Sequence, residues 1–228
     1  MTLSPEDITA IGLSMKVALT ATIVSLPFGF TAAWLIVFRS FRGKVLLEVL
    51  VNLPLTLPPV VVGYFLLLLL GTNGWPGKAL EAAGIQLIFT WKAAVIASAT
   101  VGFPLLVRSI RIGMESIDRQ LIQASRSLGA SWYDTMLTVV LPLSLRGILA
   151  GSSLMFARSL GEFGATIIVA GNIPGITQTI PLAIYDYASS PSSGSMALSL
   201  CLVAVVISVA VLILHETLGR TLDGGRKS

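Results

Sequence analysis

The sequence contains few charged residues, one cysteine and one histidine. Only 11% of its 228 residues are Asp, Glu, Lys or Arg, whereas 54% are hydrophobic, and this balance excludes a typical soluble domain. Cys201 has no second cysteine with which to form a disulfide or share a metal site. His215 has no second histidine or carboxylate cluster near it, so we assign it no ligand role. These shortages favour an integral membrane protein without a metal centre.

Long apolar runs occupy most of the chain. A helix needs about 20 mostly apolar residues to cross a bilayer. The expected spans are residues 11–38, 45–70, 91–107, 143–166 and 196–214. Pro54, Pro58 and Pro59 lie inside the second span, so we expect it to be kinked or broken and to lie within a bundle. The sequence therefore predicts an all-α membrane protein with about five spans in a single domain, residues 1–228.

Basic residues gather in alternate connections between these spans. Residues 39–44, 108–126 and 220–227 are rich in Arg and Lys, whereas the other connections are nearly neutral or acidic. Short basic connections stay in the cytoplasm, which predicts an outside amino terminus and an inside carboxyl terminus. The acidic start MTLSPEDITAIG argues against a cleaved signal peptide. Topology thus explains the net charge of +4. The sequence has no basic helix interleaved with aromatic residues, so nothing in it indicates nucleic-acid binding.

Two charged residues fall inside the fourth span. Arg158 and Glu162 are four residues apart, which places them on one helical face where they can neutralise each other. A structural pair and a transport pathway or gate are both open interpretations. Small residues on the same helix, Gly147, Gly151 and Gly161 among them, predict close helix packing.

The segment at residues 115–142 is amphipathic and lies on the predicted cytoplasmic side. Asp118 can cap a first helix that carries Leu121, Ala124 and Leu128 on one stripe, and Gly129 can end it. Ser131 and Asp134 form a capping-box pattern for a second helix, which we expect Pro142 to stop or kink. Such a unit either docks a partner or lies on its own membrane.

This segment resembles the cytoplasmic EAA loop of bacterial ABC importer permeases. Gln123, Ala124 and Ser125 stand at the EAA positions, Gly129 follows, and Leu141 with Pro142 ends the pattern. The chain departs from the family at position 123, where Gln replaces Glu and removes a charge that could pair with the ATPase, and at position 125, where Ser replaces Ala. Residues 156–185, FARSLGEFGATIIVAGNIPGITQTIPLAIY, closely resemble the molybdate permeases and their sulfate and tungstate relatives.

The resemblance implies a type I ABC importer permease in the bacterial inner membrane. It implies a homodimer, a cytoplasmic ABC ATPase dimer docked on the loops at residues 115–142, and an extracytoplasmic molybdate-binding protein, with membrane lipid around the spans. ATP and Mg would bind the ATPase and no cofactor would bind this chain. A permease for sulfate, thiosulfate or tungstate is the alternative within the class.

A membrane-embedded enzyme or a simple channel is the alternative from another class. The sequence has no G-x-x-x-x-G-K-[ST] motif and no histidine that could activate Ser152, Ser153 or Ser159. A channel would not need a cytoplasmic docking unit. The residues therefore favour a transport subunit that catalyses no reaction itself.

Overall fold

The computed structural model describes residues 3–72, 74–190 and 194–224, and these residues form helices joined by short connections. The helices are α1 (Pro5–Phe38), α2 (Lys44–Thr56), α3 (Pro59–Leu70), α4 (Trp75–Ala82), α5 (Trp91–Glu115), α6 (Arg119–Ser127), α7 (Trp132–Thr135), a π-helical turn (Met136–Val140), α8 (Leu141–Leu160), α9 (Gly164–Ala170), α10 (Ile180–Ala188) and α11 (Gly194–Gly224). The part of the predicted basic tail beyond residue 224 lies outside the described residues.

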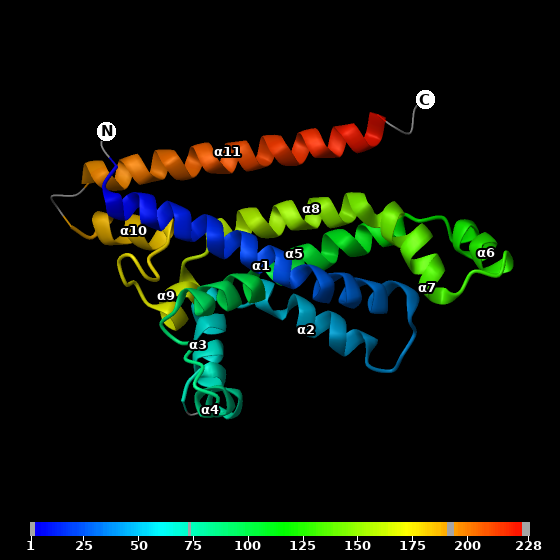
Figure 1. Cartoon of the computed structure of the whole chain (residues 1–228), viewed down its shortest axis with the longest axis horizontal. Helices are drawn as coiled ribbons and strands as arrows, with labels where there is room; N and C mark the ends of the chain where they lie inside the picture. The colour runs from blue at the N-terminus through cyan, green and yellow to red at the C-terminus, as the bar shows by residue number, and fades with distance from the viewer. Residues whose placement is uncertain (1–2, 73, 191–193, 225–228) are drawn as a thin grey trace.

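Helix α5 forms the centre of the bundle. In its most apolar stretch 61% of the residues are buried, against 6% for α11. The main core joins α5 to α1, α2, α3, α8 and α9 through side chains such as Ile36, Leu106 and Met155. Helix α11 lies along the outside of this bundle (Figure 1). Its exposed apolar side chains are suited to lipid or to a second protein chain.

Among the described residues, four helices are long and apolar enough to cross a membrane, and the bent pair α2–α3 makes a fifth candidate. The expected break of the second span is confirmed: α2 and α3 meet at an angle of 116°. Pro58 stands at the N-cap of α3 and Pro59 at its first position. A proline lacks the backbone N–H that would continue α2 and fits the first turn of a new helix, so the break falls at these residues.

Four expected spans have different ends in the structure, and the simplest case is α11, which continues past residue 214 to Gly224. Helix α1 begins at Pro5 rather than residue 11, because Ser4 and Asp7 form a capping box there. Helix α5 continues past residue 107 to Glu115. The span expected at residues 143–166 is interrupted: α8 ends at Leu160 and the chain starts again as α9 at Gly164.

The described parts of the three basic segments lie at one end of the bundle. The turn between α1 and α2, the α6–α7 unit and the end of α11 all face the same way in Figure 1, and α9, α10 and the start of α1 lie at the other end. This arrangement agrees with a single basic face of the protein. Which face meets the cytoplasm remains the prediction made from charge.

Candidate functional site

Residues 118–135 fold into the two short helices that the sequence predicts. The Asp118 carboxylate accepts a hydrogen bond of 2.8 Å from the Gln120 N–H, and Ser131 with Asp134 forms a capping box at the start of α7. Gly129 has a φ of +90°, a conformation that L side chains avoid. These local signals confirm the predicted caps of the helix–glycine–helix unit.

Helix α6 is held out from the bundle (Figure 1), and none of its side chains is buried. Gln123, Ala124 and Gly129 are exposed, and Leu128 is 89% exposed. An apolar side chain so open at the tip of a polar helix is suited to a partner protein. The predicted coupling role of these residues stays a prediction, and their surface is open for it.

Ser125 connects α6 to α7. Its hydroxyl lies 3.1 Å from the hydroxyl of Thr135, which is fully buried and also donates to the Ser131 carbonyl. Alanine, the usual family residue at position 125 by the resemblance above, could not form this bond. The departure from the family pattern therefore has a structural role within the unit.

Helix α7 is anchored to the basic end of α1 by aromatic rings. The Trp132 ring centroid lies 6.1 Å from that of Trp34 and 6.3 Å from that of Phe38. The Arg39 guanidinium lies over both Trp34 and Trp132, 5.2 and 5.8 Å from the ring centroids. Ring pairs and a cation over a ring each favour a fixed arrangement. The predicted coupling unit is thus tied to the bundle through Trp132.

Pro142 was expected to stop or kink the helix, and of these two outcomes the stop is wrong. The chain runs from α7 through the π turn into α8, where Pro142 stands in the first turn, and the Leu141 N–H donates to the carbonyl of Met136, five residues back. A proline ring normally clashes with the carbonyl four residues before it, and a π turn widens the helix at that point. Leu141 and Pro142 therefore lie on a continuous helix, from Trp132 to Leu160.

Arg158 and Glu162 form an ion pair, with 2.8 Å between Arg158 Nη1 and Glu162 Oε2. The Glu162 side chain is 1% exposed and that of Arg158 31%. Contrary to the expectation of one helical face, Glu162 lies beyond the end of α8, in the break before α9. Its Oε1 accepts a hydrogen bond of 2.8 Å from the Ala165 N–H. The carboxylate thus neutralises Arg158 and caps α9 at the same time.

The break at Glu162 lies against the break between α2 and α3. A Cβ at Gly164 would be 3.0 Å from the Pro59 Cβ, and one at Gly63 would be 2.8 Å from the Ala165 carbonyl oxygen. Two interrupted helices therefore meet beside the buried ion pair. Interrupted helices inside a membrane expose backbone groups only where protein or water satisfies them, and this is the setting of the candidate pathway residues.

The glycines of α8 lie in different surroundings. A Cβ at Gly147 would be 2.6 Å from the Ser109 carbonyl oxygen, and one at Gly151 would be 2.9 Å from that of Leu106. These two positions let α8 approach α5 closely. Gly161 is exposed because it stands at the helix break. A Cβ there would be 4.0 Å from its nearest neighbour, the Arg158 carbonyl oxygen.

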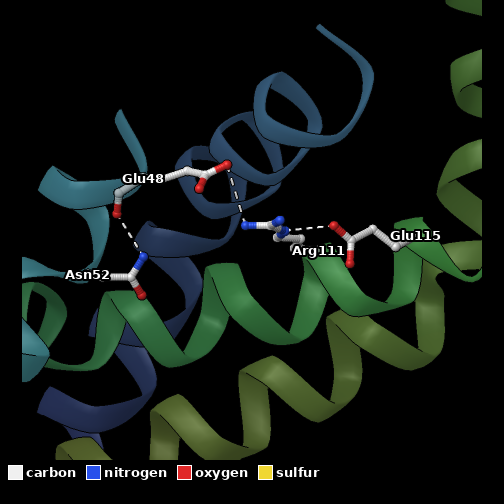
Figure 2. A network of polar contacts seen from close by, with 4 residues as sticks. All are labelled: Glu48, Asn52, Arg111 and Glu115. Atoms are coloured by element: carbon white, nitrogen blue, oxygen red, sulfur yellow. Dashed lines mark hydrogen bonds and ion pairs between the residues drawn. The ribbon is translucent and has the colours of Figure 1, made fainter. Parts of the chain in front are cut away.

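A second polar group, missed at the sequence level, lies between α2 and α5 (Figure 2). Arg111 faces Glu48 and Glu115, and the Asn52 side-chain amide donates to the Glu48 carbonyl oxygen. Arg111 and Glu115 fell outside the predicted third span, which ended at residue 107. Val107, Ile110 and Met114 continue the apolar pattern at helical spacing without a proline, and this signal would have extended the helix.

Lys16 was also missed. Its Nζ lies 3.9 Å from the centroid of the Trp91 ring, so this cation inside the expected first span is held over an aromatic face. The lysine itself, within an apolar run, was the available signal. In the described residues, no three His, Cys, Asp or Glu side chains form a group that could hold a metal ion.

Comparison with protein families gives one match that covers most of the chain. Residues 25–223 match the family described as "binding-protein-dependent transport system inner membrane component". The matched range includes α6, α7, the ion pair of Arg158 with Glu162, and the group around Arg111.

Individual proteins match over nearly the whole length. The chain is 48% identical over 218 residues to the molybdenum transport system permease protein ModB of Haemophilus influenzae, and this alignment covers 95% of both chains. It is 47% identical over 221 residues to ModB of Escherichia coli strain K12, covering 96% of both. The structure resembles a chain of a bacterial alginate ABC transporter crystallised with a periplasmic protein, with a TM-score of 0.76, 16% identity, and coverage of 96% of this chain and 80% of the other.

Proposed function

The chain belongs to the binding-protein-dependent transport system inner membrane component family, and we propose that within this family it imports molybdate. It is a multi-pass permease subunit of an ABC importer, with the all-helical fold of type I importer permeases. The likeness to ModB proteins over 95% of both chains carries the substrate proposal. The similarity is not confined to one motif, because it extends from the first span to the last.

The proposed assembly contains two copies of this chain. Each copy would present α6 and Leu128 to one subunit of a cytoplasmic ABC ATPase dimer, which binds ATP and Mg. An extracytoplasmic binding protein would deliver the oxyanion at the opposite end, near α9 and α10. The amino terminus would lie outside and the carboxyl terminus inside. The exposure of Leu128 and the gathering of basic residues at one end support this arrangement.

Movement in the proposed cycle follows from how the coupling unit is attached. Because Trp132 stacks on α1 and α7 continues into α8, a displacement of α6 by the ATPase would move these two helices together. Helix α8 ends beside the pair formed by Arg158 and Glu162. We propose that this pair lies at the pathway, where the break between α8 and α9 lets the two segments move separately.

Reconstitution tests the proposal. The permease would be placed in proteoliposomes with an ABC ATPase and a molybdate-binding protein from the same organism, and uptake of radioactive molybdate would be measured with and without ATP. We expect ATP- and binding-protein-dependent uptake that unlabelled molybdate and tungstate compete more strongly than sulfate. Uptake of sulfate in preference to molybdate would overturn the substrate, and uptake without ATP would overturn the importer.

A further inference from the structure

A cavity of about 370 Å³ opens between α1, α2 and α5 at the basic end of the bundle. Its polar lining consists of Asn52, Arg108, Arg111 and Glu115, and the remainder is apolar. Arg111 lies about 30 Å along α5 from Trp91, at ~1.5 Å per residue, which is about the thickness of the hydrocarbon core. The part of the cavity lined by Arg111 and Glu115 is therefore at the membrane surface opposite Trp91, far from the candidate pathway pair near α9.

Arg111 is held by carboxylates from two helices. Its Nε lies 2.7 Å from Glu115 Oε1 on α5, and its Nη1 lies 3.5 Å from Glu48 Oε1 on α2 (Figure 2). All three side chains are partly exposed, at 36% for Arg111, 31% for Glu48 and 47% for Glu115. The contact with Glu48 is the longer one, and a partly exposed ion pair of this kind is weak. It is the contact that a competing anion would replace most easily.

Arg108 supplies charge that has no counterpart. It is exposed, it lines the same cavity, and within residues 3–72, 74–190 and 194–224 it forms no hydrogen bond or ion pair. Arg108 and Arg111 are three residues apart on α5, which brings the two side chains onto one face. Two guanidinium groups that line one cavity bring two positive charges and several N–H donors to it, which suits a tetrahedral oxyanion.

We propose that this cavity is a binding site for the transported tetrahedral oxyanion at the inner end of the pathway, with Arg108 and Arg111 as its ligands. The proposal rests on the proposed function, since a dianion is the expected cargo. Glu48 competes with the oxyanion for Arg111 and keeps the site weak. An exit site must bind the ion well enough to receive it and weakly enough to release it. Glu48 and Glu115 weaken the binding enough for the ion to be released.

Binding measurements on the intact complex test this site. The permease–ATPase complex, without binding protein, would be equilibrated with radioactive molybdate or sulfate at constant salt, and the ATPase alone would give the background. We expect Arg108→Gln and Arg111→Gln each to weaken oxyanion binding about ten-fold or more, as expected for a charged hydrogen-bond donor. Glu48→Gln should tighten binding about five-fold, because a weak competing ion pair is lost.

Matched variants separate the site from general charge. Arg42→Gln makes the same charge change on an exposed arginine in the turn between α1 and α2, outside the cavity, and should bind as the wild type does. Arg111→Lys keeps the charge and should bind better than Arg111→Gln. If the Arg108 and Arg111 variants bind as the wild type, the site is refuted. If they bind weakly and Glu48→Gln does not bind more tightly, the competition by Glu48 is refuted.

Uptake in proteoliposomes distinguishes this inference from the proposed function. If the wild-type protein imports an oxyanion but the cavity variants bind that oxyanion normally, the proposed function stands and the exit site is refuted. Wild-type protein that imports neither molybdate nor sulfate would overturn the importer itself. With an importer in place, we expect Arg108→Gln to reduce uptake while binding-protein-stimulated ATP hydrolysis continues, because docking at α6 is unchanged.

Discussion

The hydroxyl groups of Ser125 and Thr135 lie 3.1 Å apart and join α6 to α7. Ser125→Ala removes this bond but leaves Thr135 bonded to the Ser131 carbonyl, so we expect a loss of about 1 kcal/mol in the local stability of α6. Hydrogen exchange of the α6 amides should become about five-fold faster by the same estimate. Unchanged exchange in both Ser125→Ala and Thr135→Val would show that the two helices are held together by other contacts.

Gly129 has a backbone conformation that other residues adopt at a cost. Its φ is +90° and a Cβ there would meet no other atom within 4 Å, so Gly129→Asp adds backbone strain of about 1–2 kcal/mol and a negative charge without a clash. We expect the protein to insert in the membrane but to lose uptake and stimulated ATP hydrolysis. Gly84→Asp is the control, because Gly84 has a φ of +72° and equally open surroundings in the connection that follows α4, outside α6 and outside the segment from α9 to α10. If Gly84→Asp also lost both activities, backbone strain alone would explain the effect.

Variants of the ion pair formed by Arg158 and Glu162 should differ in their thermal stability. Arg158→Ala leaves a carboxylate that is 1% exposed with only the Ala165 N–H as partner, and such a change costs on the order of 3 kcal/mol. We expect lower thermal stability of the purified protein in Arg158→Ala, and a smaller loss when Glu162→Gln is added. Lys78→Ala, on exposed α4, should be silent. A double variant less stable than Arg158→Ala would contradict this account of the buried charge.

Trp132 ties the coupling unit to α1 through Trp34 and Phe38. Trp132→Leu keeps an apolar side chain but loses the ring contacts, each of which contributes about 0.5–1.5 kcal/mol beyond simple burial. We expect normal binding of the ATPase in a pull-down but several-fold slower uptake per ATP hydrolysed. Tyr133→Leu changes an exposed ring next to it and serves as the control. Equal uptake per ATP in the two variants would remove Trp132 from the coupling route.

The parts of the structure that were predicted correctly depend on neighbours in the sequence. The caps at Asp118 and Ser131 and the left-handed glycine at position 129 are local properties, so their residues alone suffice. Pro58 and Pro59 fixed where the second span breaks, but the angle of 116° comes from packing against other helices. The break before Glu162 was missed because Gly161 was interpreted as a packing residue.

The ion pair of Arg111 with Glu48 could not be predicted in the same way. It joins residues of two helices whose relative rotation depends on the whole core, and a single sequence contains no record of which faces meet. The predicted end of the third span at residue 107 also placed Arg111 in a connection. Longer apolar periodicity on α5 was present, but two arginines within four residues outweighed it.

The unbroken run from Trp132 to Leu160 makes a continuous lever of about 43 Å, at ~1.5 Å per residue. It begins at the grip, the ring contacts of Trp132 with α1, and it ends two residues before Glu162. A tilt of about 10° at the grip would carry the far tip roughly 7 Å on a lever of that length, more than the 2.8 Å that separates Arg158 from Glu162. The π turn before Pro142, close to the grip, is where such a lever would flex, so the amplitude at the buried pair is set by geometry near the ATPase.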